Sequence, residues 1–245
     1  MTIKRLMFSP HPDDVCWAMG GNLCEMSAAD TFVSTIFSNK EFFLKKRTDG
    51  EIRKVVLAED QMAMKLANVQ YEWVGLEDAK LRGYKRLSDM LGEKVVWNNI
   101  LLEEKLLLQK VKEYMYYLNE AYLPEEVYIP LGVGKHIDHV IVRELAIEIF
   151  DNSRIRFYED MPYSTNEKWY YDGTTEMRHR LGLKKIKKHF TKVEKKKKLI
   201  ECYVSQLQIR DKNRIFAYQE NNNDEHGYYE NFWVENNELV DKGEL

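Results

Sequence analysis

The stretch that decides the fold reads Arg5-Leu6-Met7-Phe8-Ser9-Pro10-His11-Pro12-Asp13-Asp14. It begins with a short apolar run typical of a β-strand, and side chains able to act in catalysis follow at once. The same order recurs where Val127-Tyr128-Ile129-Pro130-Leu131 and Gly132-Val133-Gly134 precede His136-Ile137-Asp138-His139. In both places imidazoles and carboxylates come directly after a strand. Together the two stretches predict one metal-dependent hydrolytic site at the carboxyl edge of a sheet.

Apolar runs alternate with longer amphipathic segments along most of the chain, which predicts an α/β fold with a mostly parallel sheet flanked by helices. We interpret residues 1–245 as a single domain. Strands are expected at 5–8, 31–37, 71–75, 127–131 and 155–158, and helices at 16–29, 51–67, 100–118 and 136–150.

Composition narrows the class of protein. A net charge of −3 over 245 residues gives no general indication of a nucleic-acid or membrane partner. The first apolar run ends at Phe8, too early for a signal peptide, and no run approaches the ~20 apolar residues that span a bilayer. Cys16, Cys24 and Cys202 are odd in number and lack CxxC spacing, so we expect reduced thiols in a cytoplasmic protein.

The last third of the chain differs in texture. Residues 184–198 contain nine lysines among fifteen, which indicates either a patch for an anionic partner or, as we favour, a solvated helix face. A nucleic-acid binder using this segment is the weaker hypothesis, because acidic residues dominate elsewhere. Residues 219–225 are typical of a loop, and the aromatic residues within 228–233 are expected to pack the C-terminal end onto the body.

The polar residues of the two stretches suit a catalytic zinc site, which takes nitrogen and oxygen ligands and leaves one position for water. Three protein ligands suffice, so the surplus could supply a base, an oxyanion stabiliser and an orienting group. The six candidates are His11, Asp13, Asp14, His136, Asp138 and His139.

Local geometry sorts some of these candidates. If a helix begins at His136, then His136 and His139 share one face and both imidazoles can address one point. Asp138 could fix the tautomer of a histidine by accepting its other N–H. Of Asp13 and Asp14, one is expected to bind the metal and the other to address its water. Alternatively, the aspartates could be a helix N-cap pair and the histidines ordinary surface residues.

Two motifs resemble those of the PIG-L/LmbE-like family of zinc-dependent N-deacetylases. They are Ser9-Pro10-His11-Pro12-Asp13-Asp14, followed by Gly20-Gly21, and Gly134-Lys135-His136-Ile137-Asp138-His139. Residues 158–163 and 203–206 are also similar to family segments, without assigned chemistry. The resemblance implies a Rossmann-like fold and hydrolysis of an N-acetyl group on an N-acetylglucosamine-type amino sugar or sugar conjugate.

The resemblance also implies roles for single residues. The ligands of one zinc ion, with iron as the alternative, would be His11, Asp14 and His139. Asp13 would be the general base, and His136 the electrophilic or acid partner, oriented by Asp138, which would favour its protonated form. Family members often carry an acidic residue directly after the two aspartates, whereas this chain has Val15 at that position. We interpret the difference as the mark of a subgroup with another substrate.

Other features bear on the substrate and partners. Arg53 is the nearest candidate for an arginine that contacts substrate, and six aromatic residues are candidates for a sugar-stacking wall: Tyr114, Tyr116, Tyr117, Trp169, Tyr170 and Tyr171. We expect a small-molecule substrate, no nucleic acid and no membrane span, and leave a homo-oligomer open. An amidohydrolase for another small N-acyl metabolite, or a non-catalytic sugar-binding protein, remains an alternative.

Overall fold

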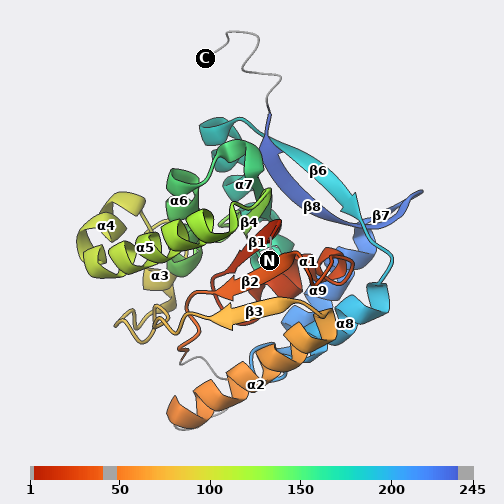
Figure 1. The fold of residues 1–245 in the computed structure, drawn as a ribbon, viewed down its shortest axis with the longest axis horizontal. Helices are drawn as coiled ribbons and strands as arrows, with labels where there is room; N and C mark the ends of the chain where they lie inside the picture. The colour runs from red at the N-terminus through yellow and green to blue at the C-terminus, as the bar shows by residue number, and fades with distance from the viewer. Residues whose placement is uncertain (1–2, 41–48, 237–245) are drawn as a thin grey trace.

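A mixed sheet forms the centre of the protein and helices cover both of its faces (Figure 1). The computed structural model describes residues 3–40 and 49–236. The strands are β1 (Arg5–Ser9), β2 (Thr31–Thr35), β3 (Gln70–Trp73), β4 (Glu126–Pro130), β5 (Ile155–Tyr158), β6 (Leu183–His189), β7 (Asn223–Asp224) and β8 (Gly227–Glu235). The helices are α1 (Asp14–Leu23), α2 (Asp49–Ala67), α3 (Leu87–Met90), α4 (Trp97–Glu103), α5 (Lys105–Tyr122), α6 (Ile137–Ile149), α7 (Glu167–Leu181), α8 (Val193–Glu201) and α9 (Ile209–Asn221), with short 3₁₀ turns at Asn152–Arg154 and Tyr163–Thr165.

The strand order is β3-β2-β1-β4-β5-β8-β6, in which β1 to β5 pair in parallel and β8 is antiparallel to both β5 and β6. The expected α/β fold with a mostly parallel sheet is therefore confirmed. From β1 the chain builds outward to β2 and β3 on one side, and later to β4 and β5 on the other. The strand order thus reverses between β1 and β4, the place where open α/β sheets bind their ligands.

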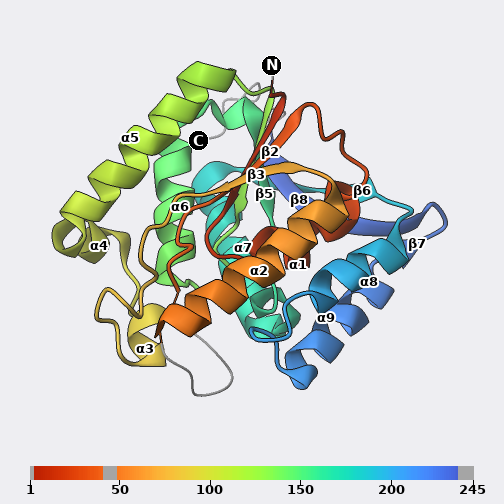
Figure 2. The same ribbon diagram turned by 60° about the horizontal axis from the view of Figure 1, so that its bottom comes forward.

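Alternate side chains along each central strand pack into two separate hydrophobic cores, one on each face of the sheet. In β1, Leu6 and Phe8 face one core and Met7 faces the other, because successive strand residues point to opposite faces. One core packs against α4 to α7, and the other against α1, α2, α8 and α9 (Figure 2). Since both faces are buried, the central strands are nearly continuous apolar runs.

Helix 100–118 was expected to be continuous, and this prediction is wrong. The chain leaves helical geometry at Glu104 (φ −111°, ψ 24°), whose carboxylate accepts a hydrogen bond from Arg82 Nε at 2.9 Å. Two helices, α4 and α5, meet at this residue. No helix within the described residues is long and apolar enough to cross a membrane.

The lysine-rich segment is not one solvated helix face. Its first half is the edge strand β6, where exposed lysines such as Lys184 and Lys185 discourage pairing with another chain. Its second half is α8, in which Lys196 is buried and pairs with Glu230 at 2.7 Å. The loop expected at 219–225 is likewise the end of α9 followed by β7.

The aromatic residues near the C-terminal end pack onto the body, as expected. They lie on β8, where Phe232 and Trp233 are buried between β5 and β6. The three cysteines are free thiols.

Candidate metal centre and active site

The carboxyl edge of the parallel strands gathers the polar residues that the sequence separates. His11, Asp13 and Asp14 follow β1, and His136 and His139 follow β4, its neighbour in the sheet. The two stretches therefore meet at the reversal of strand order. Lys40 follows β2 and Asp160 follows β5, so both lie at the same edge.

The backbone at Asp13 is strained. Asp13 adopts φ 129°, a region that non-glycine residues rarely occupy and that is concentrated at functional sites. It stands at the N-cap of α1, yet its side chain makes no capping hydrogen bond there. Its Oδ2 instead accepts a hydrogen bond from Lys40 Nζ at 3.0 Å. A capping role therefore does not account for this buried carboxylate.

A turn with three positive φ angles connects β4 to His136 and the start of α6. Gly132, Gly134 and Lys135 have φ angles of 84°, 80° and 52°. A Cβ on Gly132 would be strained by its φ of 84° and would lie 2.4 Å from Arg143 Nη1, so glycine is favoured at this position. His136 then caps α6 through its ring, because Nδ1 accepts from the Asp138 backbone N–H at 3.2 Å.

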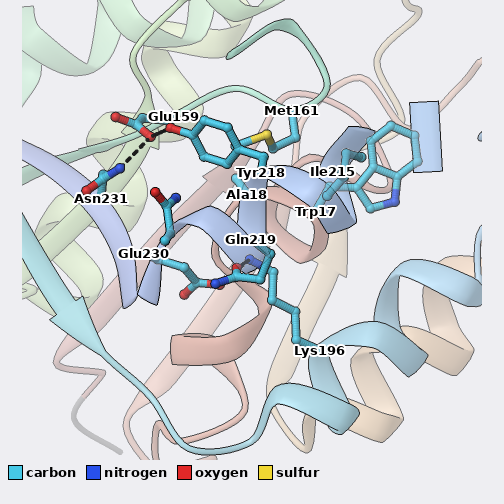
Figure 3. A pocket seen from close by; sticks show the side chains of 11 residues that line it. Trp17, Ala18, Glu159, Met161, Lys196, Ile215, Tyr218, Gln219, Glu230 and Asn231 are labelled. Atoms are coloured by element: carbon cyan, nitrogen blue, oxygen red, sulfur yellow. Dashed lines mark hydrogen bonds and ion pairs between the residues drawn. The ribbon is translucent and has the colours of Figure 1, made fainter. Parts of the chain in front are cut away.

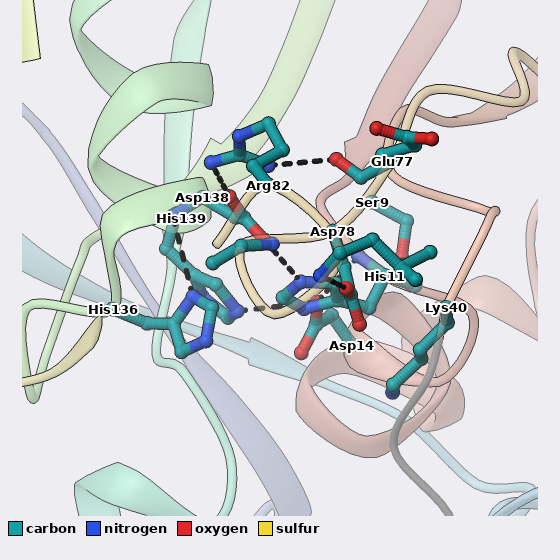
Figure 4. Close-up of polar contacts among 12 residues, drawn as sticks. Ser9, His11, Asp14, Lys40, Glu77, Asp78, Arg82, His136, Asp138 and His139 are labelled. Carbon is teal, nitrogen blue, oxygen red and sulfur yellow. Dashed lines mark hydrogen bonds and ion pairs between the residues drawn. The ribbon is translucent and has the colours of Figure 1, made fainter. Parts of the chain in front are cut away.

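Two imidazole nitrogens converge on one carboxylate oxygen (Figure 4). His11 Nδ1 lies 3.2 Å and His139 Nε2 lies 3.3 Å from Asp14 Oδ2. Ligand atoms around a tetrahedral zinc ion, each about 2.0–2.2 Å from it, are separated by about 3.3–3.6 Å. His139 Nε2 is also buried and makes no hydrogen bond, which is expected of a nitrogen that binds a metal ion. These three side chains fit a metal ion.

Carboxylates hold the opposite nitrogen of each imidazole. Asp138 Oδ2 is 2.8 Å from His11 Nε2, and Asp160 Oδ1 is 2.6 Å from His139 Nδ1. Such contacts fix the tautomer that turns a lone pair toward a metal. The Asp138 carboxylate was expected to orient His136; it bonds His11 instead, and its other oxygen accepts from Arg82 at 2.6 Å.

His136 offers a different chemistry. It belongs to a cluster with His11 and His139 in which one ring nitrogen of each lies within 4.8 Å of the others, a spacing that could also hold a metal ion. Burial lowers the pKa of His136 well below its usual value; Asp138 opposes this and the two neighbouring imidazoles add to it. Asp138 thus favours the protonated form of His136, as expected, but burial and the two imidazoles outweigh its effect on the pKa. With Nδ1 accepting a backbone N–H, the neutral ring carries its proton on Nε2 and can donate it.

The charges of the site favour a cation. Burial would lower the pKa of His139, but Asp14 and Asp160 raise it to about 10. Burial would raise the pKa of Asp14, but His139 and His11 hold it well below its usual value. Positive charge is thus strongly stabilised between these carboxylates, and a divalent ion would supply it. Burial raises the pKa of Asp13 to about 7, against the opposing effect of Lys40.

A cavity of about 420 Å³ opens over His11, Asp13, Asp14 and His136. Arg53, the expected substrate arginine, is exposed on α2 and is not among the residues that line this cavity; Arg210 and Arg214 of α9 are. Of the six aromatic candidates for a stacking wall, Trp169 lines it. The other lining residues include Lys40, Asp78, Lys80, Leu87, Met90, Leu91, Tyr163, Leu207 and Asp211.

A second, smaller cavity lies beside α1 and α9 (Figure 3). Glu159 at its wall accepts hydrogen bonds from Tyr170, Tyr218, Asn231 and Trp233. A carboxylate with so many buried donors is a structural junction between α7, α9 and β8.

Comparison with known proteins places the chain in a family. The sequence model of the PIG-L family, described as GlcNAc-PI de-N-acetylase, matches residues 6–150, more than half of the chain. The protein belongs to the PIG-L family. A 2'-N-acetylparomamine deacetylase of Streptomyces fradiae is 25% identical over 169 residues, which make up 66% of this chain and 58% of that protein. The chain thus matches less than two thirds of that relative's length.

Solved structures share the fold. A deacetylase of the teicoplanin biosynthesis pathway superimposes with a TM-score of 0.69 and 20% identity, covering 94% of this chain and 96% of that one. An N,N'-diacetylchitobiose deacetylase from Pyrococcus horikoshii gives a TM-score of 0.62 and 17% identity, covering 94% and 82%.

Sequence reasoning missed three residues that contact the candidate site residues: Lys40, Arg82 and Asp160. Lys40 and Asp160 follow predicted strands at the carboxyl edge, so strand ends were the signal that could have found them. Arg82 lies far from any strand end and had no such signal. Val15, where other family members are often acidic, is fully buried in the core between α1 and the sheet.

Proposed function

We propose that the protein is a zinc-dependent N-deacetylase of an amino sugar or sugar conjugate. The observation that carries the proposal is the convergence of His11 Nδ1 and His139 Nε2 on Asp14 Oδ2, with a carboxylate behind each imidazole. Membership of the PIG-L family and likeness to N-acetyl sugar deacetylases support the reaction.

His11, Asp14 and His139 would hold the ion, which when bound supplies Lewis acidity and lowers the pKa of coordinated water to about 7. Asp13 lies at the cavity wall with a pKa near neutrality and takes the proton of the attacking water. Neutral His136 donates its Nε2–H to the oxygen on which negative charge develops. Asp138 and Asp160 keep the two ligand imidazoles in the required tautomer.

Apolar side chains support a substrate that is larger than a bare sugar. Leu87 on α3 is 67% exposed and Trp169 on α7 is 37% exposed, and both line the cavity. Met90, Leu91 and Leu207 extend this apolar wall. Exposed apolar patches at a cleft mark binding sites. An apolar aglycone on the amino sugar would cover them.

Acetate release from a panel of N-acetylglucosamine conjugates, measured with purified zinc-loaded protein, tests the proposal. Asp13→Asn is expected to keep zinc and lose about 10²–10⁴-fold in rate, the range for loss of a general base. His11→Ala and His139→Ala are expected to lose the metal itself. Loss of zinc in Asp13→Asn with retention in Asp14→Asn would reverse the roles of the two aspartates. A zinc-loaded protein that releases no acetate from any conjugate refutes the reaction.

A further inference from the structure

Two adjacent carboxylates at this site have different partners. Asp14 faces the imidazoles of His11 and His139, whereas Asp13 is bonded to Lys40. Both aspartates are buried next to the proposed metal ligands. We propose that Lys40 is a positioning residue that keeps Asp13 out of the metal's coordination shell and thereby leaves it free to act as the base. This inference rests on the proposed metal site.

The backbone around Lys40 is firmly held. Asn39 donates its N–H to Leu76 O at 3.1 Å, and Asp78 N donates to Asn39 O at 2.9 Å. These bonds extend the pairing of β2 with the chain that follows β3. Lys40 therefore directly follows a residue that is paired at the carboxyl edge of the sheet.

The Lys40 side chain reaches inward. It is 9% exposed, and its Nζ lies 3.0 Å from Asp13 Oδ2. Figure 4 shows Lys40 on the side of Asp14 away from His136 and His139. The hydrogen bond from this ammonium therefore ties Asp13 to a group other than those two imidazoles.

Electrostatics explains why such a device is needed. A carboxylate beside a divalent ion gains most by coordinating it, since the ion is the largest local charge. A buried ammonium offers the same carboxylate a charged hydrogen bond in another direction. The strained φ of 129° at Asp13 is compatible with a side chain that its contacts hold in one position. Without the ammonium, Asp13 loses this hydrogen bond, and coordination of the metal becomes the stronger attraction for its carboxylate.

A plain structural role for Lys40 would give a different result, and the chain offers a matched control. Lys196 is also buried, at 4% exposure, and its Nζ lies 2.7 Å from the carboxylate of buried Glu230. This pair is not part of the candidate metal site. Lys196→Met removes an equally buried ion pair without touching Asp13. Any effect shared by Lys40→Met and Lys196→Met belongs to the loss of a buried charge.

The experiment uses cobalt-substituted protein, because the visible absorption of Co²⁺ weakens when its coordination number rises above four. Lys40→Met is expected to show a weaker band and an added oxygen ligand by X-ray absorption spectroscopy. The double variant Lys40→Met with Asp13→Asn is expected to return to the wild-type spectrum, and Lys196→Met to match wild type throughout. With an active substrate, kcat of Lys40→Met falls by about 100-fold or more while KM changes little.

An unchanged cobalt spectrum in Lys40→Met overturns the proposal, as does an altered one that persists in the double variant. If Lys40→Met does not fold, Lys40→Arg decides, since its guanidinium keeps the cation: an added ligand there also overturns it. The spectra need no substrate, so a protein that binds metal but releases no acetate refutes the proposed reaction alone. A wild-type protein that binds neither Zn²⁺ nor Co²⁺ refutes both.

Discussion

Replacing Asp160 by asparagine tests the tautomer logic of the site. Asp160 Oδ2 accepts the backbone N–H groups of Gly132 and Val133 at 2.7 and 2.9 Å, while Oδ1 contacts His139 Nδ1 at 2.6 Å. In Asp160→Asn the amide oxygen can keep both backbone donors, which places the NH₂ group against Nδ1. That group donates, so the imidazole proton moves to Nε2, the atom that faces Asp14.

The expected result is a loss of metal affinity without loss of the fold. Loss of such an orienting partner costs about 10–100-fold in affinity, which corresponds to about 1.4–2.7 kcal/mol. Because the substitution also reverses the tautomer of a ligand histidine, we expect a loss of metal affinity near the upper end of this range. Removal of the carboxylate in Asp160→Ala would instead strand two buried N–H groups at about 1–3 kcal/mol each and destabilise the protein.

Competition with a chelating dye measures the zinc affinity, and thermal unfolding of the metal-free protein measures the fold. Asp151→Asn, at an exposed carboxylate far from the site, is the control for the loss of a negative charge. A zinc affinity of Asp160→Asn within about twofold of wild type, with the fold intact, would refute the assignment of His139 as a ligand oriented by Asp160.

Three further outcomes are expected. Burial raises the pKa of Asp60 to about 6 from 3.8, so this group stabilises the fold below pH 3.8 and the contribution is lost as pH rises through about 6. Denaturant unfolding should therefore show Asp60→Asn gaining about 3 kcal/mol relative to wild type between about pH 4 and pH 8. Gly21→Ala places a Cβ 2.4 Å from the Phe190 ring and should cost about 1–3 kcal/mol, seen as a Tm lower by about 2–10 °C, whereas Gly20→Ala, at 3.2 Å from its nearest neighbour, should cost less. Removal of the metal by a strong chelator should abolish acetate release, and added zinc should restore it; activity that survives complete demetallation contradicts the proposed chemistry.

Local sequence patterns were sufficient for the elements that carry the site. The apolar runs at β1 and β4 are recognisable because parallel strands buried on both faces must be apolar throughout. The predicted helix boundaries were wrong where a contact with a distant residue sets them. At Glu104 the chain leaves helical geometry, and the Glu104 carboxylate pairs with Arg82. The lysine-rich segment was misassigned because exposed lysines suit an edge strand and a helix face alike.

The sequence by itself determined that His11, Asp13, Asp14, His136 and His139 stand at the ends of strands, because residue type and strand pattern are both local properties. Only the tertiary structure decided which side chains they meet. Asp138 bonds His11 across 127 residues, and Lys40 bonds Asp13 across 27. These pairs depend on strand order and register, which fix distances across the sheet that no spacing along the chain encodes.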